Sequence, residues 1–159
     1  MTKCEDNDFP CQNPDYDDFD RTAREELSEP ISADELLNHS YFCMQIPVID
    51  QFTVGDLDHK LYLKTLRGEF GLYHLWTEYE NCDDHNTHTM LCAYVGKGPP
   101  DSRIGNHVKN KWKNSEQLYI TFTPMSNRLS KYYEQLFLYC YDFDLNFSEN
   151  SGSKKLYAV

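Results

Sequence analysis

Residues 72–79 alternate with a period of two, with Leu72, His74 and Trp76 on one side and Tyr73, Leu75 and Thr77 on the other. This alternation predicts a β-strand. The residues at 81–88 are polar and turn-forming, and those at 90–95 are again apolar, so we expect a long hairpin loop and a returning antiparallel strand. The residue types at 118–122 predict a third strand.

A turn rich in glycine and proline separates the second predicted strand from a stretch with helical spacing. Asp101 and Ser102 are suitable N-cap residues for a helix that would end near Trp112. Ile104, Val108 and Trp112 recur every four residues, so they would form the buried face of this helix.

A second long helix is expected at residues 124–139, and its apolar side consists of Leu129, Tyr133, Leu136, Phe137 and Cys140. Nearer the N-terminus, Ser32 with Glu35 three residues later predicts the capped start of another helix. Residues 41–52 are apolar and β-branched around Pro47, which indicates a strand or an extended segment.

The order of these elements predicts an α+β fold, in which a small three-stranded antiparallel sheet is flanked by helices. Residues 1–60 are expected to form an acidic N-terminal arm and accessory segment, residues 61–150 the main domain, and residues 151–159 a C-terminal tail. Residues 1–30 are rich in Asp and Glu, are interrupted by proline and lack apolar periodicity. We therefore expect an arm rather than a core element there, with Phe9, Tyr16 and Phe19 as the side chains that could anchor it to a surface.

The net charge of −11 would by itself argue against a nucleic-acid partner. Residues 1–60 carry 15 acidic and 4 basic side chains, which leaves 11 of each kind in residues 61–159. Within residues 95–131, Asp101 and Glu116 stand against seven basic side chains, Lys97, Arg103, Lys109, Lys111, Lys113, Arg128 and Lys131. The acidic excess therefore belongs to the N-terminal region, and a local basic patch is available for nucleic acid.

The 6 cysteines are spread along the chain without a repeating framework, and an even number in 159 residues does not require disulfides. We therefore expect reduced thiols in an intracellular protein, cytoplasmic or nuclear. The acidic start lacks the features of a secretory signal. No run of about 18 apolar residues is present, so no membrane span is expected.

Two short aromatic strings carry the most specific signal in the chain. Gly71-Leu72-Tyr73 opens the first predicted strand, and Tyr94-Val95-Gly96 ends the second. Arg103 follows seven residues after the second string, and His107 follows four residues after Arg103. These residues bring two phenols, a guanidinium and an imidazole onto neighbouring predicted elements.

With Glu134 in the second long helix, this ordered set resembles the GIY-YIG endonuclease family, with Leu72 in place of the family's isoleucine. The string at residues 94–98, YVGKG, is also similar to the branch of the family found in ankyrin-repeat nucleases of animals. The resemblance covers residues 71–146 and leaves residues 1–60 unexplained. It identifies residues 61–150 as a GIY-YIG-like catalytic domain.

The resemblance implies a metal-dependent endonuclease that hydrolyses phosphodiester bonds of nucleic acid. DNA is the expected substrate in preference to RNA. Tyr73 would be the general base, and nearby cations would have to lower the pKa of its phenol. Arg103 would donate hydrogen bonds to phosphate oxygens. Tyr94 and His107 would orient water or phosphate, and Glu134 would hold one Mg²⁺ or Mn²⁺.

Nucleic-acid contacts are expected from the basic patch and from one residue beyond the second helix, namely Lys97, Lys109, Lys111, Lys113 and Asn146. By their spacing, Arg103, His107 and Lys111 share one helical face. In the family, an asparagine placed like Asn146 has a structural or a phosphate-contacting role.

An inactive regulatory module that binds nucleic acid or protein is the alternative function. Its acidic arm could mimic the charge of a nucleic acid and occupy the protein's own basic groove. The arm could equally bind a protein partner or keep the chain in solution. No membrane partner is expected.

A C-x2-H-x2-H-x3-C string, formed by Cys82, His85, His88 and Cys92, suggests a zinc site. The spacing is tighter than in the usual zinc-finger patterns, and Cys92 falls within the returning strand. We therefore favour a polar hairpin loop over zinc at this string.

Overall fold

The computed structural model describes residues 10–12, 14–38, 42–48, 64–111, 116–146 and 152–159. Within these ranges the backbone alone is described for residues 38, 42–48, 105, 107–111 and 116–118.

Five strands of the described chain form one antiparallel sheet in the order β1-β4-β2-β3-β5. They are β1 (Phe42–Val48), β2 (Gly71–Cys82), β3 (Thr87–Gly98), β4 (Glu116–Pro124) and β5 (Tyr157–Ala158). The hairpin of β2 and β3 is the longest pairing, and β4 and then β1 extend the sheet beside β2. The short β5 pairs with β3 at Met90 and Leu91.

The α+β prediction is confirmed, but the predicted count of three strands is wrong. The strands predicted at 72–79, 90–95 and 118–122 lie within β2, β3 and β4. The segment expected to be extended at 41–52 supplies β1, and the predicted tail supplies β5. Because β5 has only two residues, it offers no alternation that a sequence pattern could detect.

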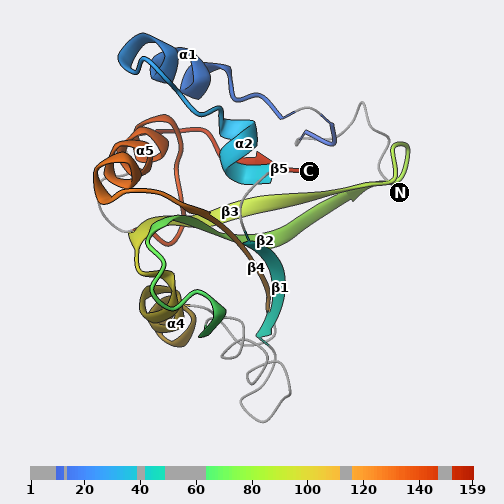
Figure 1. Cartoon of the computed structure of the whole chain (residues 1–159). Coiled ribbons are helices and arrows are strands. Elements are labelled where there is room, and N and C mark those ends of the chain that lie inside the picture. Colours follow the sequence, from blue (N-terminus) through green and yellow to red (C-terminus); the bar gives the residue numbers. More distant parts are fainter. Residues whose placement is uncertain (1–9, 13, 39–41, 49–63, 112–115, 147–151) are drawn as a thin grey trace.

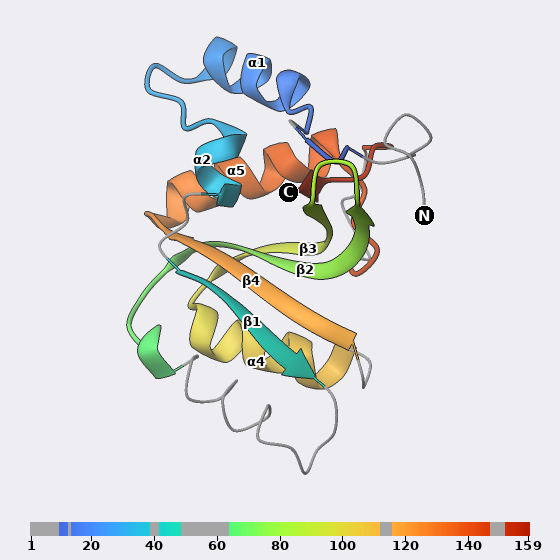
Figure 2. The same cartoon turned by 90° about the vertical axis from the view of Figure 1, so that its right-hand side faces the viewer.

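Helices cover both faces of the sheet (Figure 1, Figure 2). The helices α1 (Asp17–Glu26), α2 (Ala33–Asn38) and α5 (Asn127–Cys140) lie on one side, and α4 (Pro100–Lys111) lies on the other. Two buried clusters correspond to the two faces. The larger contains Phe19, Leu72 and Phe137, and the smaller contains Tyr73 and Ile104.

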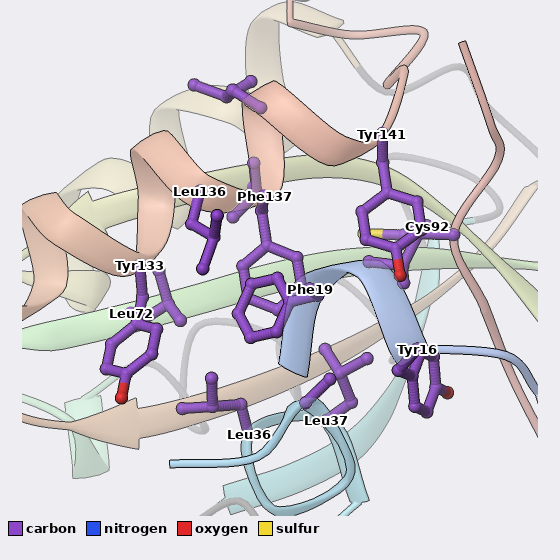
Figure 3. Close-up of a cluster of buried hydrophobic side chains, with 14 of the residues drawn as sticks. Tyr16, Phe19, Leu36, Leu37, Leu72, Cys92, Tyr133, Leu136, Phe137 and Tyr141 are labelled. Carbon is purple, nitrogen blue, oxygen red and sulfur yellow. The ribbon is translucent and has the colours of Figure 1, made fainter. Parts of the chain in front are cut away.

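Helix α1 joins the core, so the prediction that residues 1–30 contain no core element is wrong. The ring of Phe19 is fully buried, and its centroid lies 4.2 Å from that of Phe137 and 6.1 Å from that of Tyr133 (Figure 3). Tyr16 packs in the same cluster, and its hydroxyl donates a hydrogen bond of 2.7 Å to the carbonyl of Tyr157. A narrow apolar stripe is therefore enough to bury one side of an otherwise acidic helix.

The starts of the helices show local capping. Ser32 caps α2 as predicted, because its hydroxyl oxygen accepts a hydrogen bond of 3.2 Å from the N–H of Glu35. Ser126 caps α5 in the same way and accepts from the N–H of Leu129 at 3.2 Å. Helix α4 begins at Pro100, one residue before the predicted caps, and proline suits a first helical position because the N–H there has no partner within the helix.

The N-terminal region, the predicted main domain and the tail contribute to one core. Leu36 of α2 and Leu156, just before β5, are buried in the same cluster as Leu72 and Phe137. The predicted boundary at residue 60 falls at 49–63, outside the described residues. The domain limits therefore stay a prediction.

The described helices are short, and the longest of them, α5, has 14 residues. None of these helices is long and apolar enough to cross a membrane.

Candidate active site

Tyr73 lies near the start of β2 and pairs across the hairpin with Gly96 of β3. Its side chain is buried, with 1% exposed. A Cβ atom at position 96 would lie 2.5 Å from the hydroxyl oxygen of Tyr73 and 2.6 Å from the ring carbon that bears it. Glycine is therefore required at this position, because the end of the Tyr73 ring occupies the place of a side chain.

Tyr94 points to the same face of the sheet as Tyr73, because it pairs with Leu75, two residues from Tyr73 along β2. The register of β2 and β3 shifts between Leu75 and Trp76, so Ala93 has no partner in β2. Because this bulge interrupts the alternation beyond Tyr94, Ala93 also packs in the cluster that contains Tyr73 and Tyr94. The two phenol rings are stacked, with 6.2 Å between centroids and 20° between planes, and a hydrogen bond links their hydroxyls.

Arg103 lies in the first turn of α4, and its exposed side chain passes over Gly98, the last residue of β3. A Cβ atom at Gly98 would lie 2.5 Å from Nε of Arg103. Gly98 also has a φ of +125°, which favours glycine. Burial raises the pKa values of Tyr73 and Tyr94 most strongly, and the charge of Arg103 partly opposes this effect at both phenols.

Glu134 contributes a partly buried carboxylate from α5. After burial, its negative charge is the largest contribution that raises the pKa of Tyr94, and it also raises the pKa of Tyr73. The carboxylate therefore acts on both phenols, although α5 and α4 cover opposite faces of the sheet. Tyr73, Tyr94, Arg103 and Glu134 are thus brought into one electrostatic environment.

The predicted shift of Tyr73 toward phenolate is wrong for the protein alone. Burial raises the pKa of Tyr73 well above the ordinary value of a phenol. Tyr94 and Glu134 raise this pKa further, and Arg103 lowers it by less than these effects together. The phenol therefore keeps its proton at neutral pH. A positive charge beside Glu134 would act in the same direction as Arg103.

Glu134 is suited to hold a divalent cation. Carboxylate oxygens are the ligands that Mg²⁺ prefers, and Mg²⁺ usually keeps several waters. Within the described ranges, Glu134 belongs to no group of three or more clustered His, Cys, Asp or Glu side chains. Water and phosphate would therefore complete the coordination of a cation there. The partial burial of Glu134 and its influence on both phenols fit this position.

The remaining predicted residues of α4 are described only in part. The backbone of His107 lies one helical turn beyond that of Arg103. The side chains of His107, Lys109 and Lys111 lie outside the part of the chain that the structure describes. Lys113 and the predicted helix end at Trp112 lie outside the described residues altogether.

Lys97 and Asn146, both predicted to contact nucleic acid, make contacts within the protein. The ammonium group of Lys97 donates a hydrogen bond of 3.1 Å to Oδ1 of Asn127 at the start of α5. The amide of Asn146 donates to the carbonyl of Val95 at 3.0 Å and accepts from its N–H at 3.1 Å. Asn146 thereby completes the edge of β3 beside Tyr94, which is the structural one of the two roles expected for it.

The acidic helix α1 lies on the face of the sheet opposite to α4 (Figure 1). One carboxylate oxygen of its Asp18 accepts a hydrogen bond of 3.1 Å from Lys154, and the other lies 3.2 Å from Arg21. The hydrogen bond from Lys154 is the main cause that lowers the pKa of Asp18. The described part of the arm therefore lies away from α4, which carries Arg103, and the hypothesis that the arm occupies a basic groove stays a prediction.

A second cluster of chemically active side chains lies at the other end of the β2–β3 hairpin. Cys82 ends β2, His85 lies in the turn, and Cys11 comes from the N-terminal segment. Their ligand atoms all lie within 4.8 Å of one another. Burial acts to raise the pKa of Cys82, but hydrogen bonds with His85 and Cys11 outweigh it and lower the pKa to about 7.

The other two residues of the C-x2-H-x2-H-x3-C string, His88 and Cys92, do not belong to this cluster. Nδ1 of His88 contacts Oδ1 of Asn81. Cys92 is buried in the core, where its thiol donates to the carbonyl of Tyr94 at 3.4 Å and burial raises its pKa. Sequence reasoning missed Cys11 because it lies 74 residues from His85, so no local spacing connects the two.

No protein-family model matches the chain, and no curated protein or solved structure matches it either. The fold is α+β, with a cluster of titratable side chains toward each end of the β2–β3 hairpin.

Proposed function

We propose that the protein is a metal-dependent endonuclease that hydrolyses phosphodiester bonds of nucleic acid, with DNA as the favoured substrate. The observation that carries this proposal is the convergence of Tyr73 of β2, Tyr94 of β3 and Arg103 of α4, with the charge of Glu134 of α5 acting on both phenols. Gly96 of β3 leaves room for the side chain of Tyr73, and Gly98 leaves room for that of Arg103. The same residues carry the resemblance to the GIY-YIG endonuclease family.

Phosphodiester hydrolysis needs an oriented water, stabilisation of charge on the phosphate and help for the leaving oxygen. The exposed guanidinium of Arg103 is suited to the second task, because it can donate paired hydrogen bonds to phosphate oxygens. The linked hydroxyls of Tyr73 and Tyr94 are suited to orient water. Tyr73 would accept the proton of that water only where a cation held by Glu134 adds to the charge of Arg103 and lowers the raised pKa of its phenol.

A divalent cation held by Glu134 would supply positive charge at the leaving 3′ oxygen. The carboxylate of Glu134 would fix the position of that charge near the two phenols, whose pKa values the carboxylate already raises. Tyr94 is partly exposed and Arg103 is exposed, so a phosphate can reach both side chains, whereas Tyr73 lies buried behind them. The site thus offers one accessible side for a nucleic-acid strand.

The test is cleavage of supercoiled plasmid and of RNA by the purified full chain with Mg²⁺, Mn²⁺ or EDTA. We expect metal-dependent nicking of the plasmid. Tyr73→Phe and Arg103→Ala should each slow cleavage by about 100-fold, a magnitude typical for loss of one group that acts on the transition state.

Matched control variants separate chemistry from folding. Tyr139→Phe removes a hydroxyl from an exposed tyrosine of α5, and Arg24→Ala removes an exposed arginine from α1. Both controls should cleave like the wild-type chain, and all variants should keep its circular dichroism spectrum. Cleavage by Tyr73→Phe at the wild-type rate would exclude Tyr73 as the proton acceptor.

The alternative, a binding module without activity, predicts a different result from the same samples. Such a protein would bind nucleic acid with an affinity that falls as salt rises, yet it would show no metal-dependent cleavage. That combination would replace the nuclease proposal.

A further inference from the structure

We propose that Cys11, Cys82 and His85 bind one zinc ion, which fastens the N-terminal segment to the tip of the β2–β3 hairpin. This site is separate from the proposed nuclease site. Cys82 lies nine residues beyond Tyr73 on β2, about 30 Å along the strand at roughly 3.3 Å per residue.

The spacing of the three side chains fits tetrahedral zinc. Sγ of Cys11 lies 3.5 Å from Nδ1 of His85, and Sγ of Cys82 lies 3.6 Å from the same nitrogen. In tetrahedral coordination, Zn–S bonds of about 2.3 Å and Zn–N bonds of about 2.0–2.1 Å place sulfur and nitrogen about 3.6 Å apart. Both measured distances therefore agree with what the ion would impose.

The donor set also selects the metal. Two cysteine sulfurs and one imidazole nitrogen are ligands that zinc prefers over magnesium or calcium. Cys11 and Cys82 are buried, whereas His85 is exposed. Solvent can therefore reach the site from the side of His85, and a water would fill the fourth position. Asp83 and Asp84 are exposed next to the site and add negative charge around it.

The fold explains why a cross-link at this place would stabilise the protein. β4 pairs with β2 only from Gly71 to Trp76, and β5 pairs with β3 only at Met90 and Leu91, so the tip of the hairpin beyond them has two strands. A two-stranded hairpin is at best marginally stable alone in water. One described contact already brings the N-terminal segment to this part of the hairpin, where the hydroxyl of Thr89 donates a hydrogen bond of 2.9 Å to the carbonyl of Pro10. Zinc would add a second and stronger attachment.

Zinc content of the full chain, purified under reducing conditions without chelator, tests the proposal. We expect one zinc per chain in the wild type, and zinc affinity lower by roughly 100-fold or more in Cys11→Ser, Cys82→Ser and His85→Ala, because each variant loses a direct ligand. His85→Ala is the decisive variant, since it leaves both buried thiols in place and should fold. Cys140→Ser and His88→Ala remove a thiol and an imidazole outside the site and should keep the zinc.

Cobalt and hydrogen exchange give independent readouts. Co²⁺ bound to the wild-type chain should show the intense visible absorption of tetrahedral cobalt and the near-ultraviolet band of thiolate ligation, and His85→Ala should lose both. Zinc should slow amide exchange at residues 11–12 and 82–87 in the wild type but not in His85→Ala. Wild-type protein with no more zinc than Cys11→Ser, or with a Cys11–Cys82 disulfide when thiols are trapped at lysis, would overturn the proposal.

Discussion

The hydroxyl oxygen of Tyr73 lies where the side chain of its cross-strand partner, Gly96, would begin, 2.5 Å from the place of a Cβ atom. The glycine of the second sequence string therefore makes room for the tyrosine of the first. This relationship explains why the two strings occur together, and it links the packing of β2 and β3 to the geometry of the candidate site.

Gly96→Ala should disturb this site directly. The added methyl group meets the end of a buried ring instead of a flexible side chain, so Tyr73 must move. We expect a loss of about 1–3 kcal/mol in the free energy of unfolding, as is typical of overpacking, and a fall of about 100-fold in cleavage rate from the displaced phenol. Urea unfolding and plasmid nicking measure the two effects. Unchanged cleavage would show that the position of Tyr73 does not matter for activity.

Gly98→Ala should reduce activity through Arg103. Its Cβ atom would lie 2.5 Å from Nε of Arg103, and the φ of +125° adds backbone strain. Gly68→Ala is the matched control, because Gly68 also has a positive φ, +87°, but nothing lies within 4 Å of its Cβ position. Both variants should lose stability, and Gly98→Ala alone should cleave as slowly as Arg103→Ala. Equal cleavage by the two glycine variants would contradict the proposed contact.

Phe19→Ala should destabilise the whole protein. Phe19 is fully buried, and its ring packs 4.2 Å from that of Phe137, measured between centroids. Loss of a buried phenylalanine typically costs about 3–5 kcal/mol in the free energy of unfolding. Arg24→Ala, an exposed change on the same helix, is the control. A loss below about 1 kcal/mol for Phe19→Ala would mean that α1 is a detachable arm after all.

His74 should make stability depend on pH. Its ring lies edge-on to Phe137 at 4.6 Å between centroids, and burial lowers its pKa from 6.5 to about 3. Above pH 6.5 neither the folded nor the unfolded state carries this proton. As the pH falls below that value, only the unfolded chain gains it, so stability is lost.

The effect of His74 can be isolated with a neutral substitution. Between pH 7.5 and 5.0, the wild-type protein should lose about 2 kcal/mol more than His74→Gln in the free energy of unfolding. Urea unfolding of both proteins at both pH values gives this difference, and all other titrating groups cancel from it. Equal losses would show that His74 becomes protonated inside the folded protein.

The sequence predicts the part of the fold in which local patterns are strong. The alternation around Trp76, the serine cap at Ser32 and the two aromatic strings all depend on neighbours in the chain, and the structure places these elements as expected. The charge of Glu134 acts on the phenols that the strings supply, and its role in a site stays a prediction.

Long-range contacts could not be predicted in this way. Helix α1 was missed because Phe19 and Ala23 are its only fully buried side chains, and the rings that pack against Phe19 lie on α5. The cluster at the hairpin tip was missed because Cys11 enters it from a distant part of the chain. The lowered pKa expected for Tyr73 failed because burial, which a sequence does not show, outweighs the charge of Arg103.

The most direct test of the central claim is the single-turnover cleavage rate of wild type and Glu134→Gln over a range of Mg²⁺ concentrations. Gln keeps the size of the side chain but removes the charge that would hold the cation. We predict that the wild-type rate rises with Mg²⁺ and saturates, whereas Glu134→Gln cleaves about 100-fold more slowly at every concentration with unchanged stability. Equal rates with the same Mg²⁺ dependence in both proteins would contradict a catalytic site built on Glu134, Tyr73, Tyr94 and Arg103.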